Sequence, residues 1–267
     1  MLSFQFGAYE DMIESSVSLS TGHLQIQAAG YLDKPEMRKV VRRPNELLEN
    51  LRELPEIEAA APRSESFGLA AGAERSRGML VVGIDPGREA AVSSLPNQII
   101  SGRYLQEKDQ EKAIIGTLAA KRLHIEVGDE CTILGQGKDG SVAATVVTVV
   151  GIFKSGIDEF DRSTLQLPLS DFDAVFSMEG SVHRIIILLH RLSQAQQVAG
   201  QLKELLPDTD LVGLTWDELS PGLKQSIELD LISGIIMYLI LVLVVAFSIL
   251  NTFFMAIFER TRDSVSY

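Results

Sequence analysis

The chain has 267 residues, of which 46% are hydrophobic and 22% charged, a composition typical of a folded protein and not of a disordered segment. Its 24 basic and 36 acidic side chains give a net charge of −12, which disfavours nucleic acid as a partner. A single cysteine excludes an internal disulfide and a cysteine-based zinc framework.

The first 230 residues predict a mixed domain of helices and strands. Residues 23–32 alternate as in a strand, and Pro44 opens an amphipathic helix that ends before Pro55. Further strand-like segments are residues 57–62, 64–71, 78–84, 98–100, 112–115, 130–134, 141–153, 182–189 and 211–214. Further helical segments are residues 88–95, 117–123 and 193–206, followed by a helix that Asp217 is predicted to cap. We therefore expect an α+β fold in two lobes, approximately residues 1–100 with 190–230 and residues 101–189.

An uncharged, apolar segment begins at Leu231 and ends at Phe258. A helix of about 20 residues spans the hydrocarbon core of a bilayer, and this segment is longer. The alternative is a buried core helix, but such helices are shorter and normally carry a polar stripe. The sequence therefore predicts a transmembrane helix over residues 231–258, with the lipid bilayer as its surroundings.

Because this apolar segment lies near the end of the given sequence, two domain organisations are possible. The chain is either a tail-anchored protein or part of a longer protein with an earlier spanning helix. Lys224 precedes the segment, whereas Arg260 and Arg262 follow it, and basic residues mark the cytoplasmic side. We expect residues 1–230 outside the cytoplasm and residues 259–267 inside.

One glycine pattern resembles a nucleotide site but does not fit its surroundings. Residues 135–140 match the GxGxxG spacing, which in a dinucleotide site is followed by a helix that faces the pyrophosphate. The β-branched residues of 141–153 predict a strand instead, so we interpret the glycines as a hairpin loop. A phosphate-binding GxxxxGK[ST] segment is absent from the sequence.

The ionisable side chains that could form a site are scattered along the chain. They are His23, His124, His183, His190, Cys131, Asp158, Glu159 and Asp161. The histidines lack metal-binding spacing, and the cysteine lies in a predicted strand, where a small buried hydrophobe is expected. The three carboxylates lie in a predicted loop and are interpreted as solvated, although they could hold a cation weakly. The sequence predicts no catalytic, cofactor or metal site, and hence no enzyme.

Short motifs occur in a fixed order along nearly the whole chain. They are Gly22-His23-Leu24-Gln25-Ile26-Gln27 with Gly30-Tyr31, Gly83-Ile84-Asp85-Pro86, Ile100-Ser101-Gly102-Arg103-Tyr104-Leu105, Ile115-Gly116-Thr117-Leu118-Ala119, Val127-Gly128-Asp129, Val150-Gly151-Ile152-Phe153 with Gly156, Trp216 with Leu219-Ser220-Pro221, and Glu259-Arg260-Thr261-Arg262. In order and spacing this set resembles the MacB/LolC/FtsX-like ABC transporter permeases.

The resemblance implies a permease half-unit in the bacterial inner membrane, with a periplasmic domain between the first and second of four membrane helices. Residues 231–258 would be the second helix, and Glu259, Arg260 and Arg262 would lie close to the ATPase. The implied partners are an ABC ATPase subunit, a homo- or heterodimeric permease partner, and periplasmic or outer-membrane factors. Relatives release lipoproteins, export macrolides or peptides, or regulate cell-wall hydrolases through ATPase-driven motion of the periplasmic domain, called mechanotransmission.

The chain departs from this family pattern at both ends. No apolar helix precedes the domain, and Arg262 is followed by residues 263–267 in place of a glycine-bearing coupling segment. We therefore expect a permease shortened at both ends, or a fragment of one. The alternative function is a single-pass membrane-anchored periplasmic binding or sensory module, and an anchored enzyme is a third hypothesis.

Overall fold

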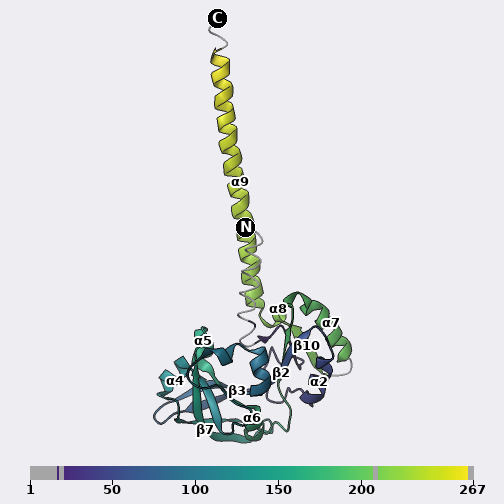
Figure 1. The fold of residues 1–267 in the computed structure, drawn as a ribbon, viewed down its shortest axis with the longest axis vertical. Coiled ribbons are helices and arrows are strands. Elements are labelled where there is room, and N and C mark those ends of the chain that lie inside the picture. Colours follow the sequence, from purple (N-terminus) through teal and green to yellow (C-terminus); the bar gives the residue numbers. More distant parts are fainter. Residues whose placement is uncertain (1–16, 18–20, 207–209, 264–267) are drawn as a thin grey trace. The chain divides into compact units, whose positions relative to one another are not determined.

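The computed structural model describes Val17, residues 21–206 and residues 210–263, with side chains up to Met255. The chain separates into two units, one ending at Leu219 and the other beginning at Ser220. Figure 1 shows strands and short helices in the first unit and one long helix in the second. The predicted membrane boundary at residues 230 and 231 lies inside that helix.

Strands of the first unit close into a ring. In order around the ring they are β2 (Ile57–Ala71), β3 (Ser76–Ile84), β8 (Thr164–Pro168), β5 (Lys112–Gly116), β7 (Val142–Phe153) and β6 (Glu130–Gln136), which returns to β2. The pairs β3 with β8 and β5 with β7 are parallel, and the other neighbours are antiparallel. Because the ring is closed, each of these strands pairs with a neighbour on both sides, and the ring encloses an apolar core.

The core of the ring comes from side chains that alternate along its strands. On β7, Val147 and Val149 are buried while Val142 and Val146 are exposed. Helices α4 (Thr117–Leu123) and α6 (Leu169–Phe176) add further apolar side chains to the same cluster. Period-two alternation therefore determines which side of each strand packs inside.

Strand β2 joins the ring to an open antiparallel sheet. Its first part pairs with β9 (Arg184–Leu189), whereas Leu69 to Ala71 pair with β6. Beyond β9 lie β1 (Leu24–Ala28) and then β10 (Leu211–Thr215). Helices α2 (Pro44–Arg52) and α7 (Ala195–Leu205) contribute to a second hydrophobic cluster with this sheet. In Figure 1 these helices and β10 lie on the right of the unit, and α4 lies on the left.

Local sequence explains why α2 and α7 form. Pro44 occupies the first turn of α2, where its missing N–H costs no helical hydrogen bond. Leu48 and Leu51 follow on one face and are buried. On α7, Val198 and Leu202 are spaced by one turn and are buried in the same cluster.

Shorter elements complete the first unit. They are α3 (Pro86–Val92), the 3-10 helices η2 (Leu95–Gln98) and η3 (Leu192–Gln194), β4 (Ile99–Gly102), α5 (Asp158–Ser163) and α8 (Trp216–Leu219). Most predicted strands and helices are confirmed, and the helix over residues 117–123 has its predicted bounds as α4.

Two predicted segments differ from the structure, and one region was not predicted. Residues 57–62 and 64–71 form one continuous strand, β2, because both flanks of Arg63 find pairing partners. The predicted loop over residues 158–161 is helix α5. Residues 164–176 form β8 and α6, which were not predicted. The α+β fold with a C-terminal apolar helix is confirmed, whereas the two-lobe division stays a prediction.

The second unit is helix α9 (Pro221–Asp263). It starts with Pro221, and proline is frequent in a first turn because its missing N–H has no partner within the helix there. Hydroxyl side chains bond back to its own backbone, as Thr252 Oγ1 does to the Ser248 carbonyl at 2.9 Å. The helix contains the whole predicted segment from Leu231 to Phe258 and continues without a break through Glu259.

Candidate functional site

Helix α9 displays a long apolar surface. Its large hydrophobic side chains are exposed from Ile232, at 54%, to Met255, at 70%. By length and composition, Pro221–Met255 is able to cross a membrane. Glu259, Arg260 and Arg262 lie in the last turns of the same helix, and their side chains lie outside the described residues.

The motif at residues 83–86 joins β3 to α3. A Cβ on Gly83 would lie 2.5 Å from Phe172 Cβ, so only glycine fits between β3 and α6. The Asp85 carboxylate accepts hydrogen bonds from the backbone N–H groups of Gly87 at 3.2 Å and Arg88 at 3.4 Å. It caps α3, and Pro86 takes the first helical position. This motif therefore sets where β3 ends and α3 begins.

The motif at residues 100–105 stabilises a close crossing of two chain segments. Gly102 has φ +75°, and a Cβ there would lie 2.2 Å from the Val150 carbonyl oxygen. The Arg103 guanidinium donates to both carboxylate oxygens of Asp109, at 2.6 and 2.9 Å. That bidentate contact holds the pKa of Asp109 below its usual range.

Asp158 and Glu159 of α5 are exposed as predicted, whereas the prediction that Asp161 is solvated is wrong. Asp161 is buried, and its Oδ1 accepts a hydrogen bond from the Ser155 N–H at 2.8 Å. Its backbone oxygen lies 2.2 Å from where a Cβ on Gly116 would be, which explains the glycine at that motif position. No group of three or more potential metal ligands occurs among the described residues.

The end of the first unit is tied to its first strand. The Trp216 N–H donates to the His23 carbonyl at 3.0 Å. The Glu218 carboxylate accepts from the Thr215 N–H at 2.9 Å, which satisfies a backbone group just ahead of α8. The prediction that Asp217 begins a helix as its cap is wrong, because Asp217 lies inside α8 and bonds to the Thr215 hydroxyl. The C-terminal end of the first unit is therefore fixed to its first strand by a backbone hydrogen bond.

Two histidines accept hydrogen bonds from backbone groups. His23 Nδ1 accepts from the Leu189 N–H at 2.9 Å, and His183 Nδ1 accepts from the Glu65 N–H at 3.0 Å. Both side chains are buried, and burial lowers the pKa of the His183 imidazole to about 4. Both imidazoles therefore lie in the core and accept hydrogen bonds from the backbone of neighbouring strands.

The remaining candidates lie apart from one another. His124 ends α4 in a left-handed conformation with φ 55°, and His190 is exposed near Glu58. Cys131 is buried inside the ring, and burial raises the pKa of its thiol to about 11. Such a thiol is a small hydrophobe and a poor nucleophile at neutral pH, as expected from the sequence.

The glycine pattern at residues 135–140 forms the turn between β6 and β7. The two strands pair antiparallel from Glu130 with Thr148 to Gln136 with Val142. Inside the turn the Gly137 N–H donates to the Ser141 carbonyl at 2.9 Å. The hairpin interpretation is confirmed, because a strand and not a helix follows the loop.

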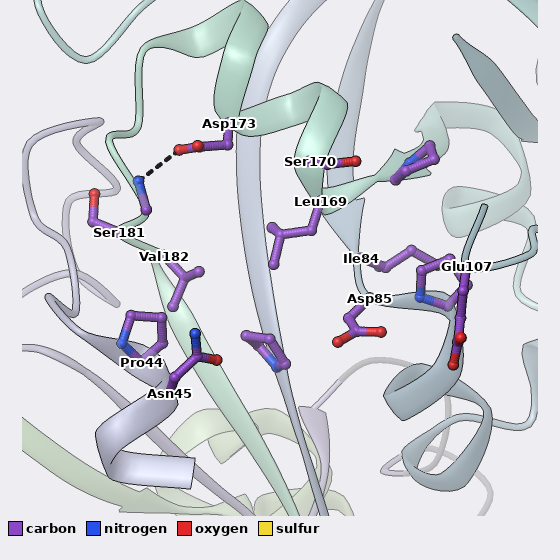
Figure 2. A pocket seen from close by; sticks show the side chains of 14 residues that line it. Pro44, Asn45, Ile84, Asp85, Glu107, Leu169, Ser170, Asp173, Ser181 and Val182 are labelled. Carbon is purple, nitrogen blue, oxygen red and sulfur yellow. Dashed lines mark hydrogen bonds between the residues drawn. The ribbon is translucent and has the colours of Figure 1, made fainter. Parts of the chain in front are cut away.

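A pocket of about 350 Å³ opens beside the motif at residues 83–86. Figure 2 shows Asn45 and Val182 on one side, Asp85 and Glu107 on the other, and Asp173 above. The Asp173 carboxylate accepts from the Gly180 N–H at 2.8 Å. Sequence reasoning missed this pocket because its walls come from segments distant in the chain. The residues that line it combine apolar contacts with carboxylates and contain no nucleophile paired with a base.

Comparisons with known proteins place this geometry in a family. Residues 1–205 match the family described as MacB-like periplasmic core domain. The periplasmic region of MacB from Actinobacillus actinomycetemcomitans has a similar fold, with TM-score 0.55, 18% identity, and coverage of 79% of this chain and 94% of that one. The extracellular domain of the noncanonic ABC-type transporter YknZ from Gram-positive bacteria gives TM-score 0.51, 14% identity, and coverage of 72% and 99%.

Curated transmembrane proteins are also similar to this chain. The lipoprotein-releasing system transmembrane protein LolC of Xylella fastidiosa strain Temecula1 is 28% identical over 216 residues, 78% of this chain and 51% of LolC. LolC of Neisseria meningitidis serogroup B is 26% identical over the same length. The fold and the apolar helix define the class, a periplasmic-type domain joined to a candidate membrane helix. The chain belongs to the MacB/LolC-like family of ABC transporter permeases, and it spans about half the length of the LolC relatives.

Proposed function

We propose that the chain is a permease subunit, or part of one, of an ABC-type export or lipoprotein-release transporter that transmits ATPase-driven motion to a periplasmic domain. The observation that carries this proposal is the continuity of α9, one helix of 43 residues from Pro221 to Asp263. At about 1.5 Å per residue such a helix is about 65 Å long, more than a hydrocarbon core of about 30 Å. An unbroken helix of this length can carry force between a domain and the cytoplasmic surface.

The proposed location is the bacterial inner membrane, with the first unit in the periplasm. The flanking charges support this orientation, because Arg260 and Arg262 follow the apolar segment. Relatives named as transmembrane proteins of a lipoprotein-releasing system support the membrane assignment. Lipoprotein release itself is part of the proposal.

The proposed partners are an ABC ATPase and a second permease subunit, identical or related. The glycine loop of the chain is a hairpin turn, so the proposal assigns nucleotide hydrolysis to the ATPase. Glu259, Arg260 and Arg262 are the proposed ATPase-proximal residues, since they end α9. The proposal includes no cofactor, metal or nucleic acid.

The alternative is a membrane-anchored periplasmic binding or sensory module. The pocket beside residues 83–86 favours it, because a pocket of about 350 Å³ with polar and apolar walls fits a small ligand. In that function α9 would only tether the domain.

Co-purification tests the proposal. The tagged chain is expressed in its own organism, solubilised in mild detergent and isolated, and any ABC ATPase that co-purifies is identified and quantified by mass spectrometry. We expect the ATPase to co-purify and the double variant Arg260→Glu, Arg262→Glu to lose at least five-fold of it. Lys224→Glu, at the other end of the apolar segment, is the matched control and should retain it. A membrane-inserted chain that never retains the ATPase would favour the tethered module.

A further inference from the structure

Basic side chains are concentrated in one short segment of an acidic chain. Residues 34–43 contain one acidic side chain, Glu36, and five basic ones: Lys34, Arg38, Lys39, Arg42 and Arg43. Five positive charges and one negative charge give this segment a formal charge of +4, whereas the whole chain has −12. A local reversal of charge attracts a compact anion, while the rest of the surface repels an extended polyanion.

Backbone contacts hold this basic segment in place. Val41 is buried and exchanges two backbone hydrogen bonds with Val182, at 2.6 and 3.0 Å. The Lys39 ammonium donates to the Gly30 carbonyl at 2.7 Å, so its charge is used within the fold. Arg43 has φ 51°, a left-handed conformation that is uncommon for a residue other than glycine. The arginine side chains on either side of Val41 therefore extend from a fixed backbone.

Three arginines of the segment line an open cavity of about 570 Å³. Its lining residues are Arg38, Val40, Arg42, Arg43, Lys138, Asp139, Glu179 and Ser181. Lys138 Nζ lies 2.9 Å from Glu179 Oε2, so these two charges form a pair. Asp139 is the remaining carboxylate, and its Oδ1 accepts a hydrogen bond from the Ser141 N–H at 2.9 Å. The three guanidinium groups thus give this cavity an excess of positive charge.

The fold leaves most of the arginine N–H groups free. Arg42 makes no hydrogen bond or ion pair among the described residues. Arg38 donates through Nε to the Lys138 carbonyl at 3.4 Å, and within the described part of the chain its terminal nitrogens have no partner. Arg43 lies 3.7 Å from the exposed Glu46, a weak pair. Because each guanidinium has five N–H donors, several donors remain for a ligand.

A second cavity, of about 590 Å³, shares Arg38 and Arg42 but suits an anion less well. Asp210 also lines it, and the Asp210 carboxylate makes no ion pair with any residue that the structure describes. An unpaired carboxylate repels an anion. The cavity on the side of Lys138 is therefore the better anion site.

We propose that the cavity lined by Arg38, Arg42 and Arg43 binds the phosphate group of a small ligand. Guanidinium groups match phosphate oxygens through pairs of parallel hydrogen bonds. A phosphate group carries up to two charges and has enough oxygens to use two guanidinium groups at once. The volume leaves room beside the phosphate for the rest of a small molecule. This site lies on the first unit, so it goes beyond the proposed permease function and does not depend on it.

Isothermal titration calorimetry of the full chain in detergent micelles tests the proposal. The probe is inorganic phosphate, at an ionic strength held constant with sodium chloride. We expect saturable binding with a Kd below about 1 mM. The double variant Arg38→Gln, Arg42→Gln should weaken binding about ten-fold or more, because it removes charged hydrogen-bond donors. The matched control Arg75→Gln, Arg77→Gln removes the same charge from two exposed arginines around the start of β3 and should leave the Kd unchanged.

A charge-preserving variant separates recognition of phosphate from general attraction. Arg38→Lys, Arg42→Lys keeps both positive charges but loses the planar arrangement of donors. It should weaken phosphate binding about three-fold or more, with a melting temperature equal to that of the parent chain, because both side chains are exposed. Binding as tight as that of the parent chain would overturn the proposed recognition.

Further outcomes identify the source of the phosphate or overturn the site. Phosphatidylglycerol added to the micelles should compete with inorganic phosphate if the natural ligand is a lipid headgroup, and should not if the ligand is a soluble phosphate compound. No saturable binding up to about 10 mM phosphate, or an equal loss in the Arg75, Arg77 control, overturns the proposal. Either result leaves the permease proposal standing, because ATPase co-purification is measured separately and involves other residues.

Discussion

Arg63 and Glu89 form an ion pair that is closed to solvent, with Nη2 of Arg63 2.5 Å from Oε1 of Glu89 and side chains 4% and 0% exposed. Arg63 lies on β2 where the ring meets the open sheet, and Glu89 lies on α3. Asp85 caps the same helix at its start. The pair therefore fixes α3 against the strand that links the two sheet regions.

Removing one charge of this pair should destabilise the domain strongly. Glu89→Gln leaves the Arg63 guanidinium buried without its counter-charge, and we expect it to lower the free energy of unfolding by about 3–5 kcal/mol. The measurement is denaturant unfolding of the full chain in detergent micelles, followed by fluorescence of the single tryptophan, Trp216. Glu46→Gln, in the exposed pair with Arg43, is the control and should cost less than about 1 kcal/mol. A loss below about 1 kcal/mol for Glu89→Gln would contradict this assignment.

Glycines of β3 should differ sharply in their tolerance of a methyl group. Gly83→Ala places Cβ 2.5 Å from Phe172 Cβ, and the overpacking should cost about 1–3 kcal/mol of unfolding free energy. At Gly78 a Cβ would meet nothing within 4 Å, so Gly78→Ala should be neutral or stabilising by up to about 1 kcal/mol. Thermal unfolding of both variants in parallel checks the contrast, and equal melting temperatures would contradict it.

Burial of His183 predicts an acid sensitivity in a defined pH range. Its folded pKa is about 4, below the ordinary 6.5, so the unfolded chain binds the proton more readily. The free energy of unfolding should therefore be unaffected by His183 above pH 6.5 and should decrease as the pH falls from 6.5 towards 4. Below pH 4 this imidazole should cause no further decrease. From these two pKa values the loss between pH 7 and pH 5 is about 2 kcal/mol.

The variant His183→Gln should remove most of this pH-dependent loss, although it lowers stability at neutral pH. Unfolding free energies at pH 7, 6 and 5 check the slope, and the exposed His190→Gln is the control. If the unfolding free energy of His183→Gln falls with pH as steeply as that of the parent chain, another group causes the acid sensitivity.

Excised residues 1–230 are predicted to be soluble and folded. Both hydrophobic clusters and the closed ring lie before Leu219, and this segment carries the net charge of −12. Circular dichroism should show mixed helix and strand with one cooperative melting transition. An aggregated or unfolded fragment would contradict the prediction.

Local patterns made several elements of this fold predictable. The β-branched residues of 141–153 predicted β7, and Pro44 with its leucines predicted α2. Helix α5 was predicted as a loop, because a short helix among Gly and Ser residues has too little periodicity to be recognised. Motif residues such as Gly83 and Gly102 were identified by resemblance, but their role in close backbone packing needed coordinates.

By itself the sequence determined the apolar segment after Leu231, the charges at its ends and most strands and helices, because these depend on residues close together along the chain. Only the tertiary structure decided that β6 closes a ring onto β2, that Arg63 meets Glu89, and that distant segments line the pocket at Asp85. Such contacts join segments far apart in sequence, and their pairing depends on packing and strand register, which local composition does not specify.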